Sequence, residues 1–397
     1  MNNKYIFYFD EIYHDRNITN KSIADDNFYN SYISVGLGIS KLNKEKGLRR
    51  LRLLDSKYKV VFSVQELKSH VVKRKKYKNG LASFGDNDLN LYLEFFDILY
   101  NYNFIYYISS CNKVEYILNQ CTYNGYGYLN GIAIIYAIAK AINIYKPAGV
   151  IQSLFNENDQ FLNNLKSFLI EQIQINGSIA LKEKENIAFS QALVFLENID
   201  VKKVKYEFSY DFTYIGLKHL LSELEIDIHD VKPIIDEEGT GKILQTAKKN
   251  GFTNSIQMDS KGSVGVRAAD LINGFIGRLM EGIYLSTYYE PGTLYSEKHD
   301  IPLEWFKVNE KQFKLYKTVA KYLKKYSFLH YSTYISIYSD LFISIIGLIY
   351  YFDEYMNFDE YNKVKIENHK EKCNGGIVSM TYEHLKDIES MGFENAV

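Results

Sequence analysis

The chain has 397 residues, of which 46% are hydrophobic and 24% are charged, and its formal net charge is −1. These values are typical of a soluble globular protein with room for a sizeable core. The three cysteines, Cys111, Cys121 and Cys373, form no C-x-x-C pair. This spacing excludes a disulfide framework and a zinc site of that type, and it favours a reducing, cytoplasmic location.

The ends of the chain and its most apolar run predict no membrane association. The N-terminus opens on a predicted strand instead of a charged region followed by an apolar block, so we expect no signal peptide. The most apolar run, Leu341 to Phe352, is well short of the roughly 20 residues that span a bilayer. It predicts a buried helix.

The first predicted strand, Tyr5 to Phe9, is an unbroken run of aromatic and β-branched residues that ends on Asp10 and Glu11. Such a run is typical of a buried strand in the middle of a sheet. A carboxylate at the tip of a buried strand is poorly hydrated, so it needs a base, a donor network or a cation as its partner. Alternatively, both acids cap a turn or helix and face solvent.

The next predicted strand leads into a strongly basic segment. Tyr32 to Ile39 predicts a strand that would make the sheet partly antiparallel if it pairs with the first. Lys41 to Lys78 then holds 14 Lys or Arg and 3 acids. Such a segment attracts phosphate backbones through counterion release, or it is the solvated face of a helix around Leu48 to Leu54. The candidate nucleic-acid-binding residues are Arg49, Arg50, Arg52, Lys73, Arg74, Lys75 and Lys76.

The middle of the chain predicts two strands and then a helical block. Val60 to Val64 predicts a short strand that precedes Glu66, and Phe104 to Ile108 predicts another. From Lys113 to about Leu224 the periodicity is mainly helical, which predicts an insertion packed on the sheet. The helices predicted in this part of the chain are Asp86 to Asn101, Tyr128 to Tyr145, Gln160 to Gln174, Leu181 to Glu197 and Asp211 to Leu224.

The last part of the predicted sheet brings two more acids. Val231 to Ile235 predicts a strand that ends on Asp236, with Glu237 and Glu238 next. Ser255 to Asp259 predicts a further strand, and the helix Val264 to Met280 carries Asp270 beside its core-facing residues. The remaining predicted elements are a short helix from Lys242 to Lys249 and two aromatic-rich helices between Trp305 and Tyr355, with no element beyond Glu360.

One competing motif fails on its residue types. Gly239-Thr240-Gly241-Lys242 follows a predicted strand and opens a helix, which is the context of a phosphate-binding loop. A Walker A loop requires Gly at the position of Asp236 and Ser or Thr at that of Ile243. The acid at the first position would also repel a phosphate, so we do not predict nucleotide binding here.

Asp10, Glu66, Asp236 and Asp270 come from four elements, and we expect them to converge. Gathered carboxylates raise one another's pKa unless a cation compensates their charge, and oxygen-rich sites suit Mg²⁺ or Mn²⁺. Two such ions roughly 3.5–4 Å apart clamp the oxygens of a phosphodiester during cleavage. Alternatively, Asp270 faces solvent on its helix, and the acids after Asp236 cap the helix that follows.

These residues, in this order, resemble the DUF3800 family of bacterial proteins across about residues 4 to 280. The resemblance implies a ribonuclease H-like fold in which Asp10, Glu66, Asp236 and Asp270 bind metal, with Glu11 and Lys68 in support. Ile12 replaces the expected Ser, and Arg267 stands where Gln is commoner. The motifs that carry the resemblance are Tyr8-Phe9-Asp10-Glu11, Glu66-x-Lys68, Ile234-Ile235-Asp236-Glu237, Asp259-Ser260 and Ala268-Ala269-Asp270-Leu271-Ile272.

The prediction is therefore an α/β protein with a ribonuclease H-like core over residues 1–290. A helical insertion occupies about 113–228, and a helical extension covers 291–397. We expect a nuclease that uses Mg²⁺ or Mn²⁺, as two ions, with His14 and Glu237 as further supporting residues. The alternatives are a non-catalytic nucleic-acid-binding or interaction component, as in phage-defence or mobile-element systems, and metal-dependent phosphoryl transfer on a nucleotide. A protein partner or a homodimer remains open.

Overall fold

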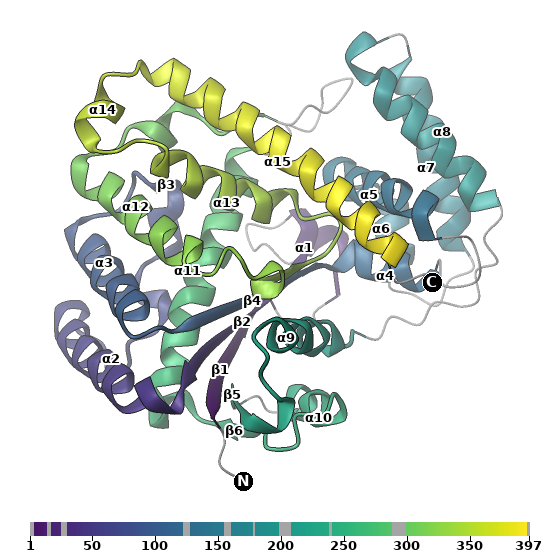
Figure 1. Ribbon diagram of the computed structural model, residues 1–397. Helices are drawn as coiled ribbons and strands as arrows, with labels where there is room; N and C mark the ends of the chain where they lie inside the picture. Colours follow the sequence, from purple (N-terminus) through teal and green to yellow (C-terminus); the bar gives the residue numbers. More distant parts are fainter. Residues whose placement is uncertain are drawn as a thin grey trace.

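The computed structural model describes residues 4–13, 17–24, 30–121, 128–154, 160–177, 179–197, 208–237, 240–287 and 299–394. Its centre is a mixed six-strand sheet with the order β6-β5-β1-β2-β4-β7, flanked by helices (Figure 1). A short strand, β3 (Lys78–Leu81), is not part of this order. The strands of the sheet are β1 (Tyr5–Ile12), β2 (Ser31–Ser40), β4 (Ile105–Asn112), β5 (Val231–Asp236), β6 (Ile256–Met258) and β7 (Thr333–Ile335).

The strand β1 lies in the interior of the sheet, as its apolar run predicts. It pairs antiparallel with β2 and parallel with β5. The pairing with β5 stops at Phe9 and Ile235, so Asp10 and Asp236 both stand where the two parallel strands reach their carboxyl ends. In open α/β sheets this edge is where ligands bind.

One face of the sheet is covered by the long helix α11 (Val264–Ser286). Tyr8 points to this face, and Gly265 lets the helix approach it closely: a Cβ at Gly265 would lie 2.5 Å from the Tyr8 ring. Since side chains alternate along a strand, Asp10 points to the same face. The helices that pack around α11 on this side are α2 (Lys41–Phe62), α3 (Asp86–Asn101), α12 (Glu310–Lys324) and α13 (Asp340–Asp353).

The opposite face is covered by α9 (Asp211–Glu223), beside which α10 (Lys242–Lys249) packs. Phe9 contacts Tyr214 of α9, with ring centroids 5.9 Å apart. The hydroxyl of Tyr107 on β4 donates to the carbonyl of Thr213 at 2.6 Å. The two faces of the central strands are therefore both buried, as their continuous apolar runs predict.

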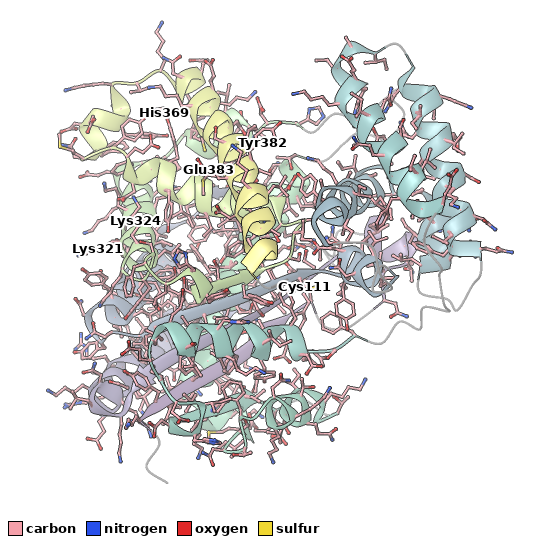
Figure 2. The ribbon with its side chains drawn as sticks, turned by 45° about the vertical axis from the view of Figure 1, so that its right-hand side comes forward. Cys111, Lys321, Lys324, His369, Tyr382 and Glu383 are labelled. Carbon is pink, nitrogen blue, oxygen red and sulfur yellow. The ribbon has the colours of Figure 1, made fainter. Side chains whose placement is uncertain are left out.

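A second hydrophobic cluster lies within the helical block and is separate from the main core. The last long helix, α15 (Ile366–Glu394), contacts both α13 and this block (Figures 1 and 2). The helices of the block are α4 (Lys113–Cys121), α5 (Tyr128–Tyr145), α6 (Ala148–Leu154), α7 (Gln160–Asn176) and α8 (Glu183–Glu197); the short helices are α1 (Asn20–Ala24) and α14 (Phe358–Asn362).

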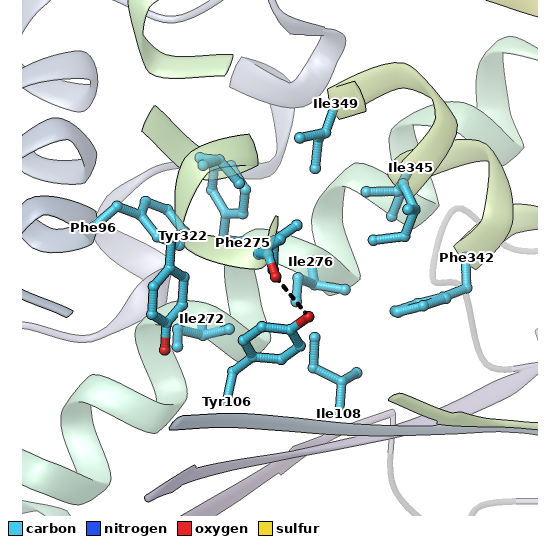
Figure 3. Close-up of a pocket in the computed structure, with 13 residues that line it drawn as sticks. Phe96, Tyr106, Ile108, Ile272, Phe275, Ile276, Tyr322, Phe342, Ile345 and Ile349 are labelled. Carbon is cyan, nitrogen blue, oxygen red and sulfur yellow. Dashed lines mark hydrogen bonds between the residues drawn. The ribbon is translucent and has the colours of Figure 1, made fainter. Parts of the chain in front are cut away.

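A small apolar pocket lies between β4, α11, α12 and α13 (Figure 3). Tyr106, Ile276, Phe342 and Ile349 are among the side chains that line it. Its volume of about 10 Å³ is at the lower limit for one water molecule, and its lining is apolar. It is a packing gap in the core and has no room for a ligand.

Most predicted elements are confirmed, but the strand predicted at Val60 to Val64 is wrong. The helix α2 continues through Phe62 and ends at Ser63, whose φ of 53° is left-handed. Val60 is 80% exposed at the end of this helix. A short β-branched run does not by itself distinguish a strand from the end of a helix. The tail beyond Glu360 was also underestimated, because it forms α15.

Candidate functional site

Asp10 is a buried carboxylate on β1 beneath α11. The side-chain amide of Asn273 on α11 donates to its Oδ2 at 2.8 Å. Burial raises the pKa of Asp10 well above its ordinary value, and the charges of Asp270, Glu11 and Asp236 raise it further, whereas the hydrogen bond from Asn273 opposes them. The protein therefore holds this carboxylate among other negative charges.

Asp236 lies at the end of β5, partly buried. The backbone N–H of Glu237 donates to its Oδ1 at 3.0 Å. Burial raises the pKa of Asp236, and so does the charge of Asp270, while the Lys68 ammonium acts against both. Asp10, Asp236 and Asp270 thus influence one another electrostatically, although they are far apart in the chain.

Asp270 reaches the same place from α11, where it is bound by the short 3₁₀ helix Ser69–Val71. Ser69 donates to the carboxylate twice, from its backbone N–H at 2.5 Å and from its hydroxyl at 3.0 Å. Burial raises the pKa of Asp270, and these hydrogen bonds together with Lys68 and Arg278 oppose the rise. Arg278 also donates to the carbonyls of Ser69 and Val72, which secures this segment on α11.

A glycine on α11 makes this contact possible. A Cβ at Gly274 would overlap both the Cβ and the hydroxyl of Ser69. Real side chains essentially never approach so closely, so only glycine leaves room for Ser69 to contact the helix. Gly274 therefore determines whether Ser69 can bind Asp270.

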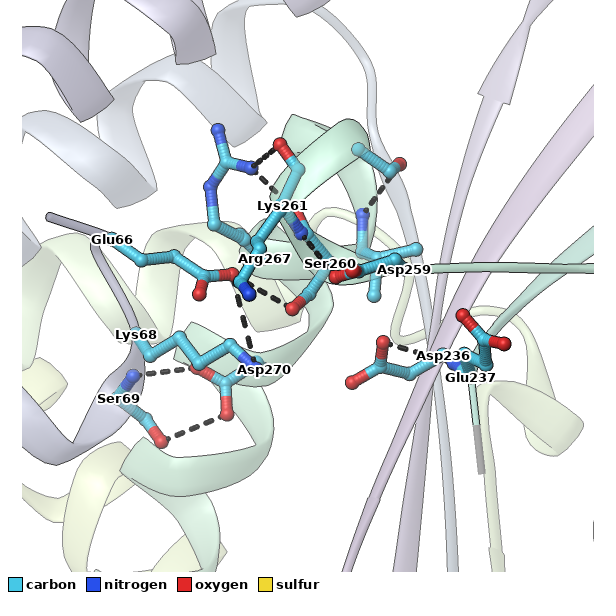
Figure 4. Close-up of polar contacts among 12 residues, drawn as sticks. Glu66, Lys68, Ser69, Asp236, Glu237, Asp259, Ser260, Lys261, Arg267 and Asp270 are labelled. Atoms are coloured by element: carbon cyan, nitrogen blue, oxygen red, sulfur yellow. Dashed lines mark hydrogen bonds and ion pairs between the residues drawn. The ribbon is translucent and has the colours of Figure 1, made fainter. Parts of the chain in front are cut away.

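Glu66 and Lys68 lie on the segment that leads into Ser69 (Figure 4). The hydroxyl of Ser260 donates to Glu66 Oε1 at 2.7 Å, and Lys68 Nζ lies 3.8 Å from the same oxygen. The backbone of Ser260 also hydrogen bonds to Asp236 and so lowers its pKa. Ser260 thus links Glu66 to Asp236, and Lys68 contributes the positive charge.

The predicted supporting residues differ in their placement. Glu11 raises the pKa of Asp10, but it also raises that of Tyr32, which packs against Phe208 beside α9. Glu237 is exposed and contacts Asp236 through its backbone N–H. The prediction for His14 lies outside the described residues.

The seven basic residues predicted to bind nucleic acid divide into two groups. Arg74 forms an ion pair with the buried Glu281, and Lys76 lies 3.6 Å from the buried Asp88, so both stabilise the fold. The other five are exposed: Arg49, Arg50 and Arg52 on α2, and Lys73 and Lys75 near the 3₁₀ helix Arg74–Tyr77.

Arg267, the departure from the family pattern, is a structural residue. Its guanidinium binds Asp55 of α2 through two bonds, Nε to Oδ1 at 3.0 Å and Nη2 to Oδ2 at 2.9 Å, and both residues are buried. The same guanidinium donates to the carbonyls of Ser260 and Lys261. It therefore joins α2, α11 and the turn that carries Ser260, and it is not available to a substrate.

Sequence reasoning missed Asn273, Ser69 and Ser260. A signal existed for Asn273, because residues three apart lie on the same side of a helix and Asn273 follows Asp270 by three. Ser69 directly follows the Glu66-x-Lys68 motif. Ser260 follows Asp259 in a quoted motif, but nothing in the sequence indicates that its hydroxyl binds Glu66.

A divalent cation fits this site by donor type and charge but not by spacing. Carboxylate oxygens are the ligands that Mg²⁺ and Mn²⁺ prefer, and the mutually raised pKa values show uncompensated negative charge. The buried Asn273 Oδ1, beside Asp10, has no hydrogen-bond partner. Within the described residues, however, no three His, Cys, Asp or Glu side chains are placed so that they could hold a metal ion.

Comparisons of the chain with protein-family models, curated proteins and solved structures gave no match. The resemblance to the DUF3800 family therefore stays a prediction. No single helix in the described part of the chain is long and apolar enough to cross a membrane. One pair, Ala133–Tyr145 with Ala148–Leu154, meets the length and composition criteria together but is bent by 116°.

Replacing Arg267 by Gln, the residue commoner in the family, should destabilise the protein. Breaking a buried ion pair costs about 3–5 kcal/mol, and the remaining contact of Asp55 with Lys59 places the expected loss of unfolding free energy at the lower end. Chemical denaturation measures it. Lys311→Gln, which removes an exposed ion pair with Asp86, should change it by less than about 1 kcal/mol. Equal losses in the two variants would contradict the structural role of Arg267.

Gly274→Ala should lower the unfolding free energy by roughly 1–3 kcal/mol, because the added methyl overpacks the contact with Ser69. Gly376→Ala is the matched control: Gly376 is exposed in the helix α15 and a Cβ there would meet nothing within 4 Å. That variant should gain roughly 0.5–1 kcal/mol from helix propensity. A gain for both alanines would mean that Ser69 does not lie against α11.

In metal-free buffer, Asp10→Asn should be more stable than the wild type at neutral pH. Because the folded-state pKa of Asp10 is raised, the folded wild type loses stability as pH rises through that pKa, whereas the neutral amide of the variant does not titrate. The advantage of the variant should thus vanish near about pH 4 and grow toward about pH 8 in thermal unfolding.

Asp353→Asn should behave in the opposite way. Burial acts to raise the pKa of Asp353, but hydrogen bonds from Lys324 and Lys317 lower it overall. This carboxylate therefore adds stability at neutral pH that is lost as pH falls through its pKa. An Asp10→Asn profile that follows the Asp353→Asn profile would contradict the electrostatic description of the site.

Proposed function

We propose that this protein is a divalent-metal-dependent nuclease that hydrolyses nucleic acid phosphodiester bonds. The observation that carries the proposal is the convergence of Asp10, Asp236 and Asp270 from β1, β5 and α11, where each is influenced by the charge of another. Buried like charges are costly, and proteins keep them at functional sites where a cation or a proton is handled.

The proposed ligands are Asp10, Glu66, Asp236 and Asp270, and the proposed cofactor is Mg²⁺ or Mn²⁺, as two ions. Bound ions of this type would neutralise charge on the phosphate and promote ionisation of the attacking water. The chain's own residues orient the carboxylates: Asn273 holds Asp10, and Ser69 holds Asp270. Lys68, with its partly exposed ammonium, can also attract a phosphate.

The ribonuclease H-like fold belongs to the same proposal. Its support is a mixed sheet in which β1 pairs parallel with β5 and antiparallel with β2. Two of the proposed ligands stand at the carboxyl ends of the parallel strands, and α11 brings a third across the face of the sheet. Membership of the DUF3800 family is likewise proposed from the order of the motifs.

The proposed substrate, RNA or DNA, rests on the exposed basic side chains of α2. Arg49, Arg50 and Arg52 follow one another on this helix, and the charge of Arg52 lowers the pKa of Tyr8. Tyr8 lies two residues before Asp10, so this basic surface extends toward the carboxylates. Guanidinium groups bind phosphate oxygens in a planar, two-point geometry.

A second candidate function is a nucleic-acid-binding component without catalysis. It is favoured by the finding that no three potential metal ligands of the described chain have the spacing to hold an ion. Such a protein would use the exposed arginines of α2 and would bind nucleic acid with a strong dependence on salt and no dependence on divalent cations.

Cleavage assays distinguish the two. We expect the wild type to cut labelled RNA or DNA with Mg²⁺ or Mn²⁺ and not with EDTA. Asp10→Asn and Asp270→Asn should each slow cleavage on the order of 100-fold or more, since each removes a charge that the ion needs. Asp97→Asn, an exposed acid on α3, is the control and should cleave normally. Retained cleavage in folded Asp10→Asn and Asp270→Asn would refute the assignment; binding without cleavage by the wild type would favour the second candidate.

A further inference from the structure

Lys68 is the one residue of the Glu66–Val72 segment that brings a positive charge to the cluster. Its ammonium lies 3.8 Å from Glu66 Oε1. The next residue, Ser69, binds both oxygens of Asp270, so the lysine is fixed between two of the proposed ligands by its place in the chain. Figure 4 shows Glu66, Lys68 and Asp270 beside one another, with Asp236 across from them.

Electrostatics extends the reach of Lys68 to the third carboxylate. Its charge opposes the rise of pKa at both Asp236 and Asp270. For Asp236 it is the largest influence after burial, ahead of the backbone hydrogen bonds. The lysine therefore stabilises the ionised form of carboxylates that come from β5 and α11.

We propose that Lys68 is the internal counter-cation of the carboxylate cluster and that it competes with a divalent cation for it. The inference rests on the proposed cation site. The same negative charge attracts the ammonium and the ion, and the two positive charges repel each other at short range. A lysine has a flexible four-carbon stem, and this side chain is 29% exposed, so it can turn toward solvent when an ion binds.

Competition also accounts for the spacing of the ligands. In this arrangement Glu66 accepts from Ser260 and faces Lys68, and Asp270 accepts from Ser69. Each of these carboxylates is satisfied by a donor of the chain itself. Binding of an ion then requires exchange of Lys68 against the ion, which keeps the site charge-balanced in both states.

The first test needs no metal. Lys68→Gln should lower the thermal unfolding midpoint in EDTA, because the carboxylates lose their cation. The loss should be smaller in the Asp236→Asn background, and a double-mutant cycle measures this coupling. Lys307→Gln removes an ion pair with Glu304 elsewhere on the surface and should show no coupling to Asp236. Additive effects of Lys68→Gln and Asp236→Asn would overturn the inference, whatever the protein does to nucleic acid.

The second test is a calorimetric titration with Mn²⁺ alone. Lys68→Gln should bind Mn²⁺ on the order of tenfold more tightly than the wild type, since it removes a positive charge from the site. Lys307→Gln should bind as the wild type does. Equal or weaker binding by Lys68→Gln, or no binding by either protein, would overturn the competition. Tighter binding without any cleavage would support the role of Lys68 while refuting the nuclease proposal, so the two failures are distinguishable.

Discussion

The constraint on which this structure depends is the burial of like charges at the carboxyl ends of β1 and β5. Asp10 lies under α11 with one neutral hydrogen-bond donor, Asn273, and its pKa is raised by burial and by its acidic neighbours. Such an arrangement costs stability unless something compensates it. A protein gains nothing structurally from placing three aspartates in this way, which is why the cluster directs attention to function.

The helix α11 makes the cluster possible. Its glycines let it lie close to the sheet and to Ser69, and its polar residues bind the surrounding segments. Arg267 pairs with Asp55 of α2, and Arg278 secures the Ser69 segment. The buried ion pair of Arg267 fixes the turn of Ser260, which in turn binds Glu66. The positions of the proposed ligands therefore follow from contacts that lie outside the cluster itself.

The sequence was sufficient for much of this architecture. The apolar runs predict β1, β2, β4 and β5, because strands buried on both faces have a distinct pattern, and helical periodicity predicts α3 and α11. Convergence of the acids follows from their positions at strand ends.

Other features depend on contacts between distant residues, which a single sequence does not show. The valines after Tyr58 belong to the end of α2, and local preference could not separate that from a strand. The partners of Arg267 and of Asp270 lie more than 200 residues away in the chain. Two of the basic residues are neutralised by acids that the fold brings to them, Arg74 by Glu281 and Lys76 by Asp88.

The most direct test of the central claim is the anomalous scattering of manganese in crystals soaked in Mn²⁺. The account predicts density between Asp10, Asp236 and Asp270, with the ammonium of Lys68 turned away from Glu66. Crystals that diffract well and show manganese elsewhere, or none at this edge of the sheet, would contradict it.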